Sequence, residues 1–158
     1  MPVEMEGIFV GVNYNKNLSG DVGISVGLQY RSNNRIEDKG EDNEAIYKQV
    51  LFDIPVLFNY AYKINDNLKI SAFVGTTFNL ALGGISRCDY YDVLETWYYD
   101  NQLNKFDIAA TLGFSAQYSH YRLFFGYSQG LLDLGVDESP YTFNVKVSNV
   151  FIGTSYVF

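Results

Sequence analysis

Several residue types that stabilise or equip other classes of protein are scarce in this chain of 158 residues. Cys88 is the single cysteine, which excludes an intrachain disulfide and a cysteine-based metal cluster. No apolar run approaches the roughly 18 residues that a transmembrane helix requires. Basic residues number 11 against 18 acidic ones, and the resulting net charge of −7 argues against nucleic acid as a partner.

Aromatic residues and glycine, by contrast, are abundant. The chain has 14 tyrosines, 12 phenylalanines and 14 glycines. Aromatic side chains suit the pleated surface of a strand, whereas glycine is unfavourable inside helices. The composition therefore favours an all-β fold, and the length fits one domain that spans residues 1–158.

Hydrophobic residues recur with a period of two along most of the chain. In residues 21–31, for example, the even positions are apolar or aromatic and the odd positions are small or polar. This period is typical of strands. It predicts strands over residues 7–15, 21–31, 46–63, 68–82, 105–118, 121–129 and 142–158.

Two of these strands carry an irregularity. Pro55 has no N–H to donate to a ladder, so we expect a bulge or a local irregularity there. In the last strand the apolar face changes between Val147 and Val150, which predicts a bulge near Ser148 and Asn149.

The apolar face of the strands is predicted to face lipid. The opposite face consists mostly of Gly, Ser, Thr, Ala, Asn and Gln, which are too small and too polar for a conventional core. In water, the apolar faces would exceed the roughly few hundred Å² that a soluble monomer exposes. Charges on the apolar face are limited to Lys48 and Lys146, toward strand ends, where a charge costs only ~0–1 kcal/mol. We therefore predict an antiparallel, up-and-down transmembrane β-barrel.

The connections alternate between short and long. Short turns are predicted at 16–19, 65–67 and 119–120, and long polar loops at 32–45, 84–104 and 130–141. In such barrels the short turns are periplasmic and the long loops extracellular. Seven strands are countable, but antiparallel closure between first and last strands needs an even number. We expect a first strand upstream, together with an export signal. A seven-stranded or differently paired assembly, or a misread first strand, is the alternative.

Five short segments carry a family resemblance: FDIPVL at 52–57, AFVG at 72–75, ATLGF at 110–114, GYSQGL at 126–131 and IGTSYVF at 152–158. In their order and spacing they resemble the small, porin-like outer-membrane β-barrel family common in Bacteroidetes-type bacteria, which has an eight-stranded architecture. The resemblance spans nearly the whole chain and implies a location in the bacterial outer membrane, among outer-membrane lipid and lipopolysaccharide. It names no reaction.

Two sets of residues inside and at the end of the predicted barrel have expected roles. An interior bounded by about eight strands is just wide enough for side chains to fill it, and buried charges must be paired. We expect a closed lumenal polar network, with Phe9, Phe73 and Phe124 also pointing inward; its charged members are Arg31, Asp53, Lys69, Asp107 and Arg122. Tyr156 and Phe158 share one face of the last strand and form the predicted membrane-rim signal for the barrel assembly machinery.

The aromatic loop at 84–104 is the predicted contact surface. Its aromatic residues are Tyr90, Tyr91, Trp97, Tyr98 and Tyr99. Exposed Tyr and Trp supply contact area at low entropic cost, so an extracellular protein or glycan is the expected partner. An aromatic girdle at the outer membrane interface is the alternative interpretation.

Nothing in the sequence has the pattern of a catalytic or metal site. His120 lies in a predicted periplasmic turn, and the acidic 37–44 segment lacks the spacing of a calcium loop. We therefore hypothesise a structural or adhesive protein of the Gram-negative cell surface that is not an enzyme and has no cofactor or metal. Alternatives are a narrow pore or transporter for small solutes, a lipid- or peptide-cleaving barrel enzyme, and a soluble lipocalin-like ligand binder.

Overall fold

The computed structural model describes residues 6–38, 44–88, 96–97, 104–133 and 146–157. Every regular element in these ranges is a β-strand. The strands are β1 (Glu6–Ser19), β2 (Val22–Asp38), β3 (Glu44–Lys63), β4 (Leu68–Cys88), β5 (Thr96–Trp97), β6 (Phe106–Tyr118), β7 (Tyr121–Gly130) and β8 (Ser148–Tyr156).

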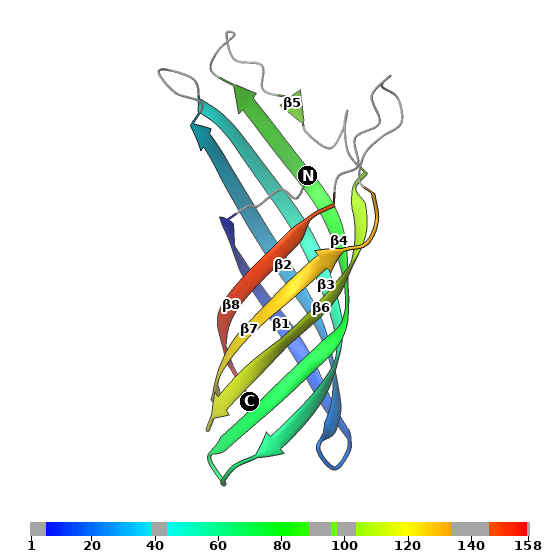
Figure 1. Cartoon of the computed structure of the whole chain (residues 1–158), viewed down its shortest axis with the longest axis vertical. Helices are drawn as coiled ribbons and strands as arrows, with labels where there is room; N and C mark the ends of the chain where they lie inside the picture. The colour runs from blue at the N-terminus through cyan, green and yellow to red at the C-terminus, as the bar shows by residue number, and fades with distance from the viewer. Residues whose placement is uncertain (1–5, 39–43, 89–95, 98–103, 134–145, 158) are drawn as a thin grey trace.

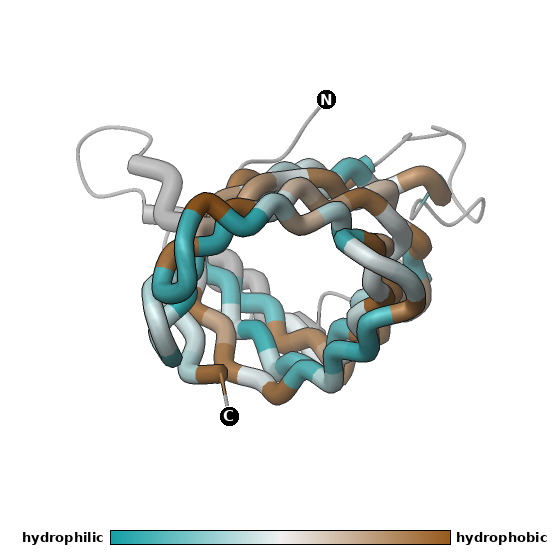
Figure 2. The backbone as a smooth tube through the Cα atoms, turned by 90° about the horizontal axis from the view of Figure 1, so that it is seen from below, coloured by the Kyte–Doolittle hydropathy of each residue, from teal (hydrophilic) through white to brown (hydrophobic). Residues whose placement is uncertain are grey.

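The strands form one antiparallel meander. Its order is β1-β2-β3-β4-β6-β7-β8, and the short β5 pairs with β4. Each long strand pairs with the next one along the chain, as expected for an up-and-down topology (Figure 1). Figure 2 shows the sheet curling round a central axis. Two of the short turns contain a residue with a positive φ of 53°, Gly20 in one and Ser119 in the other. Glycine adopts this conformation without steric cost.

Four strands are clearly longer than the hydrophobic pattern predicted. Residues 16–19 belong to β1, so the short turn predicted there was wrong. Residues 32–38 and 44–45 belong to β2 and β3, and residues 84–88 to β4, so the predicted loops at 32–45 and 84–104 were wrong in these parts. The β2–β3 ladder continues to Asp38 and Glu44. Backbone hydrogen bonds extend a strand without an apolar side, which is why alternation does not reveal these ends. In Figure 1, β2, β3 and β4 reach farther than β7 and β8 toward the long loops.

The two predicted irregularities have different outcomes. Around Pro55 the β2–β3 ladder skips two positions between Val26–Val56 and Gln29–Asp53 and then continues in the same register, which confirms an irregularity without a bulge. The predicted bulge near Ser148 and Asn149 is wrong for the strand described, because β8 begins at Ser148 and pairs with β7 without a register shift. Residues 142–145 lie outside the described ranges.

The two faces of the sheet differ as predicted. Exposed apolar residues follow one another along the outside of every long strand, and Ile8 of β1, at 79% exposure, is the extreme case. Along β6 and β7, buried or partly buried residues alternate with these exposed ones. The buried side chains are mostly polar and line the inside of the curled sheet; among them are Ser25, Asn33, Gln49, Asp53, Thr77, Asn79, Asp107, Thr111 and Ser128.

β1 and β8 lie at the two edges of the sheet. Within the described ranges, β1 pairs with β2 alone and β8 with β7 alone. Seven long strands in an antiparallel meander place β1 and β8 in the same direction. The described strands therefore form a curled sheet with two free edges, in agreement with the odd number counted from the sequence.

Candidate functional site

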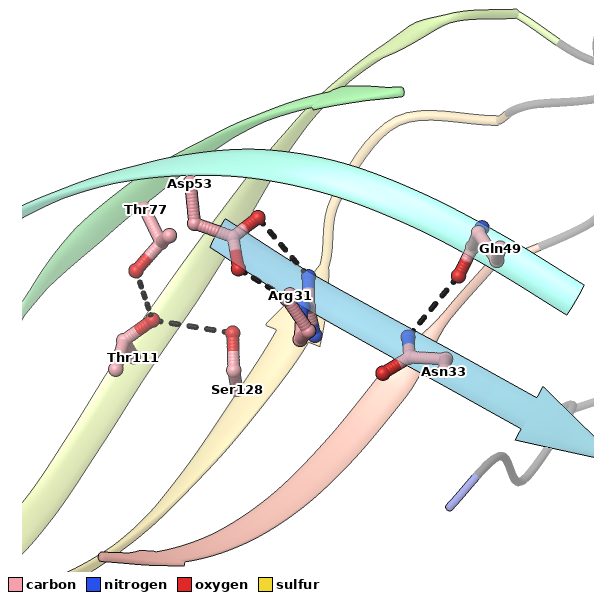
Figure 3. A network of polar contacts seen from close by, with 7 residues as sticks. All are labelled: Arg31, Asn33, Gln49, Asp53, Thr77, Thr111 and Ser128. Atoms are coloured by element: carbon pink, nitrogen blue, oxygen red, sulfur yellow. Dashed lines mark hydrogen bonds and ion pairs between the residues drawn. The ribbon is translucent and has the colours of Figure 1, made fainter. Parts of the chain in front are cut away.

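An ion pair between neighbouring strands anchors the polar part of the lumen. Arg31 of β2 and Asp53 of β3 meet through two contacts, Nε to Oδ2 at 2.8 Å and Nη2 donating to Oδ1 at 3.1 Å. Their side chains are only 14% and 5% exposed. A paired guanidinium and carboxylate of this kind hold each other in a fixed geometry. The alternation places both on the inward face of the sheet, as Figure 3 shows.

Uncharged side chains extend this polar layer round the barrel. Asn33 Nδ2 donates to Gln49 Oε1 at 3.1 Å. The hydroxyl of Thr111 lies 2.8 Å from that of Thr77 and 3.1 Å from that of Ser128, so it links β4, β6 and β7 (Figure 3). All five side chains are buried, which makes each satisfied hydrogen bond matter to stability. We call these five residues, together with Arg31 and Asp53, the polar layer.

The other predicted charged residues of the lumen have different surroundings. Asp107 is buried and accepts a hydrogen bond from the backbone N–H of Leu132 at 3.2 Å. Arg122 donates to Gln117 Oε1 at 3.0 Å, and its buried Nε has no hydrogen-bond partner in the described structure. Lys69 is partly exposed, opposite Gln117 on the neighbouring strand. Arg31 and Asp53 are thus brought together, whereas a single network of all five charged residues stays a prediction.

Four phenylalanine rings meet in the lumen. Phe9 of β1 lies 5.9 Å from Phe124 of β7 and 6.4 Å from Phe151 of β8, measured between ring centroids. Phe151 also lies 6.3 Å from Phe124 and 6.4 Å from Phe73 of β4. These separations are those of aromatic rings in contact. The phenylalanine cluster (Phe9, Phe73, Phe124 and Phe151) therefore joins four strands across the interior.

Glycines on neighbouring strands make room for three of these rings. Gly113 lies opposite Phe73, Gly153 opposite Phe124 and Gly126 opposite Phe151. A Cβ atom added at any one of these glycines would come within 2.4 to 2.5 Å of the Cζ atom of the ring opposite it.

Phe151 is the member of the cluster that sequence reasoning missed. Phe9, Phe73 and Phe124 were expected to point inward from alternation alone. The signal for Phe151 is its place between Val150 and Ile152, which are exposed on the outer face of β8. Its partner Gly126 becomes visible only when the strand register is known.

A cavity of about 370 Å³ connects the polar layer and the phenylalanine cluster. Its lining includes Asp53, Thr111 and Ser128 of the polar layer and Phe73 and Phe124 of the cluster. On their strands, Thr77 and Ser128 lie four residues from Phe73 and Phe124, toward the long loops. On β4 and β7 the cluster therefore lies nearer the short turns than the hydroxyl groups of the polar layer do.

Tyrosines gather on the outside at the end with the short turns. The exposed tyrosines there are Tyr14, Tyr60, Tyr62, Tyr118, Tyr121 and Tyr156. Tyr156, one of the two predicted rim residues, stacks on His120 with 5.5 Å between ring centroids and meets Tyr121 edge-on at 5.6 Å. Such a girdle is typical of a membrane–water interface. Phe158 lies outside the described residues.

Of the predicted contact loop, the structure describes residues 84–88, 96–97 and 104. Trp97 belongs to β5, opposite Ile85 of β4. Tyr90, Tyr91, Tyr98 and Tyr99 lie outside the described residues.

In the part of the chain that the structure does describe, no helix is long and apolar enough to cross a membrane. The same residues include no group of three or more His, Cys, Asp or Glu side chains placed to hold a metal ion.

The fold and its surface define a class of protein. An all-antiparallel curled sheet with an apolar outer face, a polar lumen and a tyrosine girdle is a transmembrane β-barrel domain. Residues 6–135 match the family model of the outer membrane protein beta-barrel domain, and the chain belongs to this family. The match confirms the predicted fold class and the location in the bacterial outer membrane. No curated protein and no solved structure matches the chain significantly.

Proposed function

We propose that this outer-membrane barrel is a non-conducting anchor that holds and displays its long loops, in a structural or adhesive role. The observation that carries the proposal is the contact of phenylalanine rings across the lumen, together with the hydrogen-bonded polar layer that lines it. The phenylalanine cluster joins β1, β4, β7 and β8 across the interior. Nearer the long loops, the polar layer joins β2 to β3 through Arg31 and Asp53, and β4, β6 and β7 through Thr111.

The contents of the lumen oppose ion passage in two ways. Rings in contact at centroid distances of 5.9 to 6.4 Å leave no space between them for a hydrated ion. The Arg31–Asp53 pair neutralises its own charges, so this pair offers no free counter-charge to an ion that enters from the long-loop end. An ion that passes between these rings would have to lose its water against an apolar surface, which is strongly unfavourable.

The end with the long loops has the features of a display surface. β2, β3 and β4 extend beyond β7 and β8 at that end (Figure 1), and β5 fixes Thr96 and Trp97 to the extension of β4. The aromatic residues of the predicted contact set flank β5 in the sequence. Tyr and Trp side chains are the common anchors of binding surfaces, so an extracellular protein or glycan is the proposed partner.

A catalytic role has less support. Nδ1 of His120 lies 3.0 Å from Oγ of Ser119, but both residues are exposed in a short turn at the opposite end from the long loops. A hydroxyl nucleophile also requires a third group that orients the histidine. The ring of His120 instead stacks on Tyr156, which suits a rim contact.

Conductance in planar lipid bilayers tests the proposal. The wild-type protein is expected to give no steady ionic current, whereas substitution of Phe9, Phe73, Phe124 and Phe151 together by alanine should open a current. The matched control replaces four outward phenylalanines by alanine and should stay silent; these are Phe58, Phe78, Phe114 and Phe125. A steady wild-type current would overturn the anchor and favour the second candidate, a narrow pore for small solutes, to which the polar lining of the 370 Å³ cavity points.

The display role has a separate test on intact cells. Replacement of Tyr90, Tyr91, Trp97, Tyr98 and Tyr99 by serine should abolish binding of expressing cells to arrayed glycans or extracellular-matrix proteins, while heat-modifiable mobility stays unchanged. Binding that is equal for the two proteins would show that the aromatic set is not the contact surface.

A further inference from the structure

Four side chains on the inward face form a row across neighbouring strands at the end with the short turns. Lys69 of β4 lies opposite Gln117 of β6. Gln117 in turn lies opposite Arg122 of β7, which lies opposite Ser155 of β8. Lys69 and Arg122 are the second residues of their strands, and both strands begin at the short turns (Figure 1). We call these four residues the basic row.

The basic row carries two positive charges and no negative one. Within the described residues, neither Lys69 nor Arg122 takes part in an ion pair. The short turns contain two acidic residues, Asp21 and Asp66. Both are exposed, and Asp66 binds Lys63. The polar layer balances its own charges, whereas the inward face at this end of the lumen has an excess of positive charge.

Gln117 holds the guanidinium group of Arg122 in place. Nη2 of Arg122 donates to Oε1 of Gln117 at 3.0 Å, and Nε2 of Gln117 donates to the backbone oxygen of Ser119 at 2.9 Å. Nε of Arg122 is buried and has no hydrogen-bond partner among the described residues. Arg122 and Ser155 both line the cavity of about 370 Å³. An oriented donor group beside this cavity therefore lacks an acceptor.

An unpaired guanidinium group beside apolar rings requires an anion. Phe124 of the phenylalanine cluster lies two residues after Arg122, on the same face of β7. Removing a charge from water beside such rings is costly unless an opposite charge pairs with it. The Nε and Nη groups of arginine form a planar fork that matches the oxygens of a carboxylate or a phosphate. The expected partner of Arg122 is therefore an oxyanion.

Spacing and charge favour phosphate over carboxylate. Only β6 separates β4 from β7, so the Cα atoms of Lys69 and Arg122 are about 9–10 Å apart, and their long side chains can reach one group between them. A phosphate monoester carries a charge of about −1.5 to −2 at neutral pH. A carboxylate carries a single negative charge. Of the two groups, only phosphate balances both cations.

We propose that the basic row binds a terminal phosphate group. The guanidinium of Arg122 and the ammonium of Lys69 hold it, and the hydroxyl of Ser155 is a further donor. The short turns of such a barrel face the periplasm, so the phosphate enters from that side. Its source is a soluble phosphate compound or the headgroup of a lipid with a terminal phosphate. The site lies at the opposite end from the long loops, and its occupancy does not depend on whether the lumen conducts.

Calorimetric titration with inorganic phosphate tests the proposal. The protein is held in phosphatidylcholine nanodiscs at neutral pH, and saturable binding at one site is expected. Acetate should bind more weakly, because it balances only one of the two charges. Arg122→Gln and Lys69→Gln should each weaken phosphate binding by about tenfold or more, which is the contribution of one hydrogen bond to a charged group.

Three variants separate a built site from a general effect of charge. Lys16→Gln is the matched control and should leave phosphate binding unchanged, because Lys16 is exposed on the outer face of β1 near the same end. Arg122→Lys keeps the charge but lacks the planar fork, so it should recover only part of the affinity. Heat-modifiable mobility shows whether each variant folds. If Arg122→Gln does not fold, Lys69→Gln and Ser155→Ala, which should weaken binding less, decide the matter.

The lipid composition identifies the source of the phosphate. The titration is repeated with phosphatidic acid in the nanodisc and, as a control for surface charge, with the same share of phosphatidylglycerol, which has no terminal phosphate. Equal binding in both assigns the site to a soluble compound, and weaker binding with phosphatidic acid assigns it to the lipid headgroup. Absence of saturable phosphate binding in phosphatidylcholine nanodiscs would overturn the proposal. Equal affinities for acetate and phosphate, or equal losses in Lys16→Gln and Lys69→Gln, would overturn it as well.

Discussion

Two regions of the lumen are held together by different kinds of contact. Toward the long loops, the polar layer relies on directed contacts such as the Arg31–Asp53 pair and the hydroxyl chain through Thr111. Toward the short turns, the phenylalanine cluster relies on size, because rings occupy the space that glycines leave free. One inward face can thus combine directed polar contacts with the packing of rings. A different kind of substitution should disrupt each of these two contacts.

The largest expected effect comes from separating the ion pair. Asp53→Leu leaves the Arg31 guanidinium buried without its partner, and we expect a loss of about 3–5 kcal/mol in the free energy of unfolding. The double substitution Arg31→Met with Asp53→Leu removes both charges and should recover most of that loss. Urea-induced unfolding in lipid vesicles measures both.

The exposed Lys63–Asp66 pair in a short turn is the control for this prediction. Nζ of Lys63 donates to Oδ1 of Asp66 at 2.9 Å, and this hydrogen bond, aided by the positive charge, lowers the pKa of Asp66. The small stabilisation that this pair contributes is therefore present above the ordinary pKa of an aspartate. It is lost as the pH falls through the lowered pKa of Asp66. Asp66→Asn should have no measurable effect on unfolding, because exposed pairs contribute little. Equal losses for Asp53→Leu and Asp66→Asn would refute a special role of burial.

A smaller effect is expected from filling one of the glycine positions. Gly113→Val pushes side-chain atoms against the ring of Phe73 and the backbone oxygen of Phe125, and overpacking of this kind typically costs ~1–3 kcal/mol. Adding Phe73→Ala should relieve the contact with the ring, so the two changes together should cost less than their sum. The outward Ala110→Val on the same strand is the control. Simple additivity in the same unfolding assay would count against the glycine–ring fit.

The smallest effect is expected from the hydroxyl chain. Thr111→Val keeps the shape of the side chain but removes the oxygen between Thr77 and Ser128, and we expect a loss of about 1 kcal/mol in the free energy of unfolding. Thr154→Val, an exposed position on β8, is the matched control and should be neutral. If Thr111→Val were equally neutral, water or other groups would be replacing the lost partner.

Much of the fold was predictable because lipid imposes a simple rule. Apolar residues must face outward wherever a strand crosses the membrane, so the alternation in residues 21–31 or 105–118 reveals both the strand and its orientation. Where a strand extends beyond the membrane, its outward residues need not be apolar. The extensions of β2 to Asp38 and of β4 to Cys88 were missed because they depend on backbone pairing, which leaves no hydrophobic pattern.

The sequence predicted which side chains face the lumen, but not which of them contact each other. Alternation alone places Arg31, Asp53 and Asp107 on the inward face. It does not show that Arg31 meets Asp53 while Asp107 binds the backbone of Leu132. These contacts depend on the strand register, because inward side chains on adjacent strands meet only where the register brings them close together.

The amino-acid sequence by itself determined that this protein is an antiparallel membrane barrel with a polar interior, because the period of two and the solvent preference of each face are local properties. Only the tertiary structure decided which phenylalanine lies opposite which glycine, which charges pair, and that two edges running in the same direction border one lumen. Those features depend on contacts between residues far apart in the chain, and a local pattern contains no information about them.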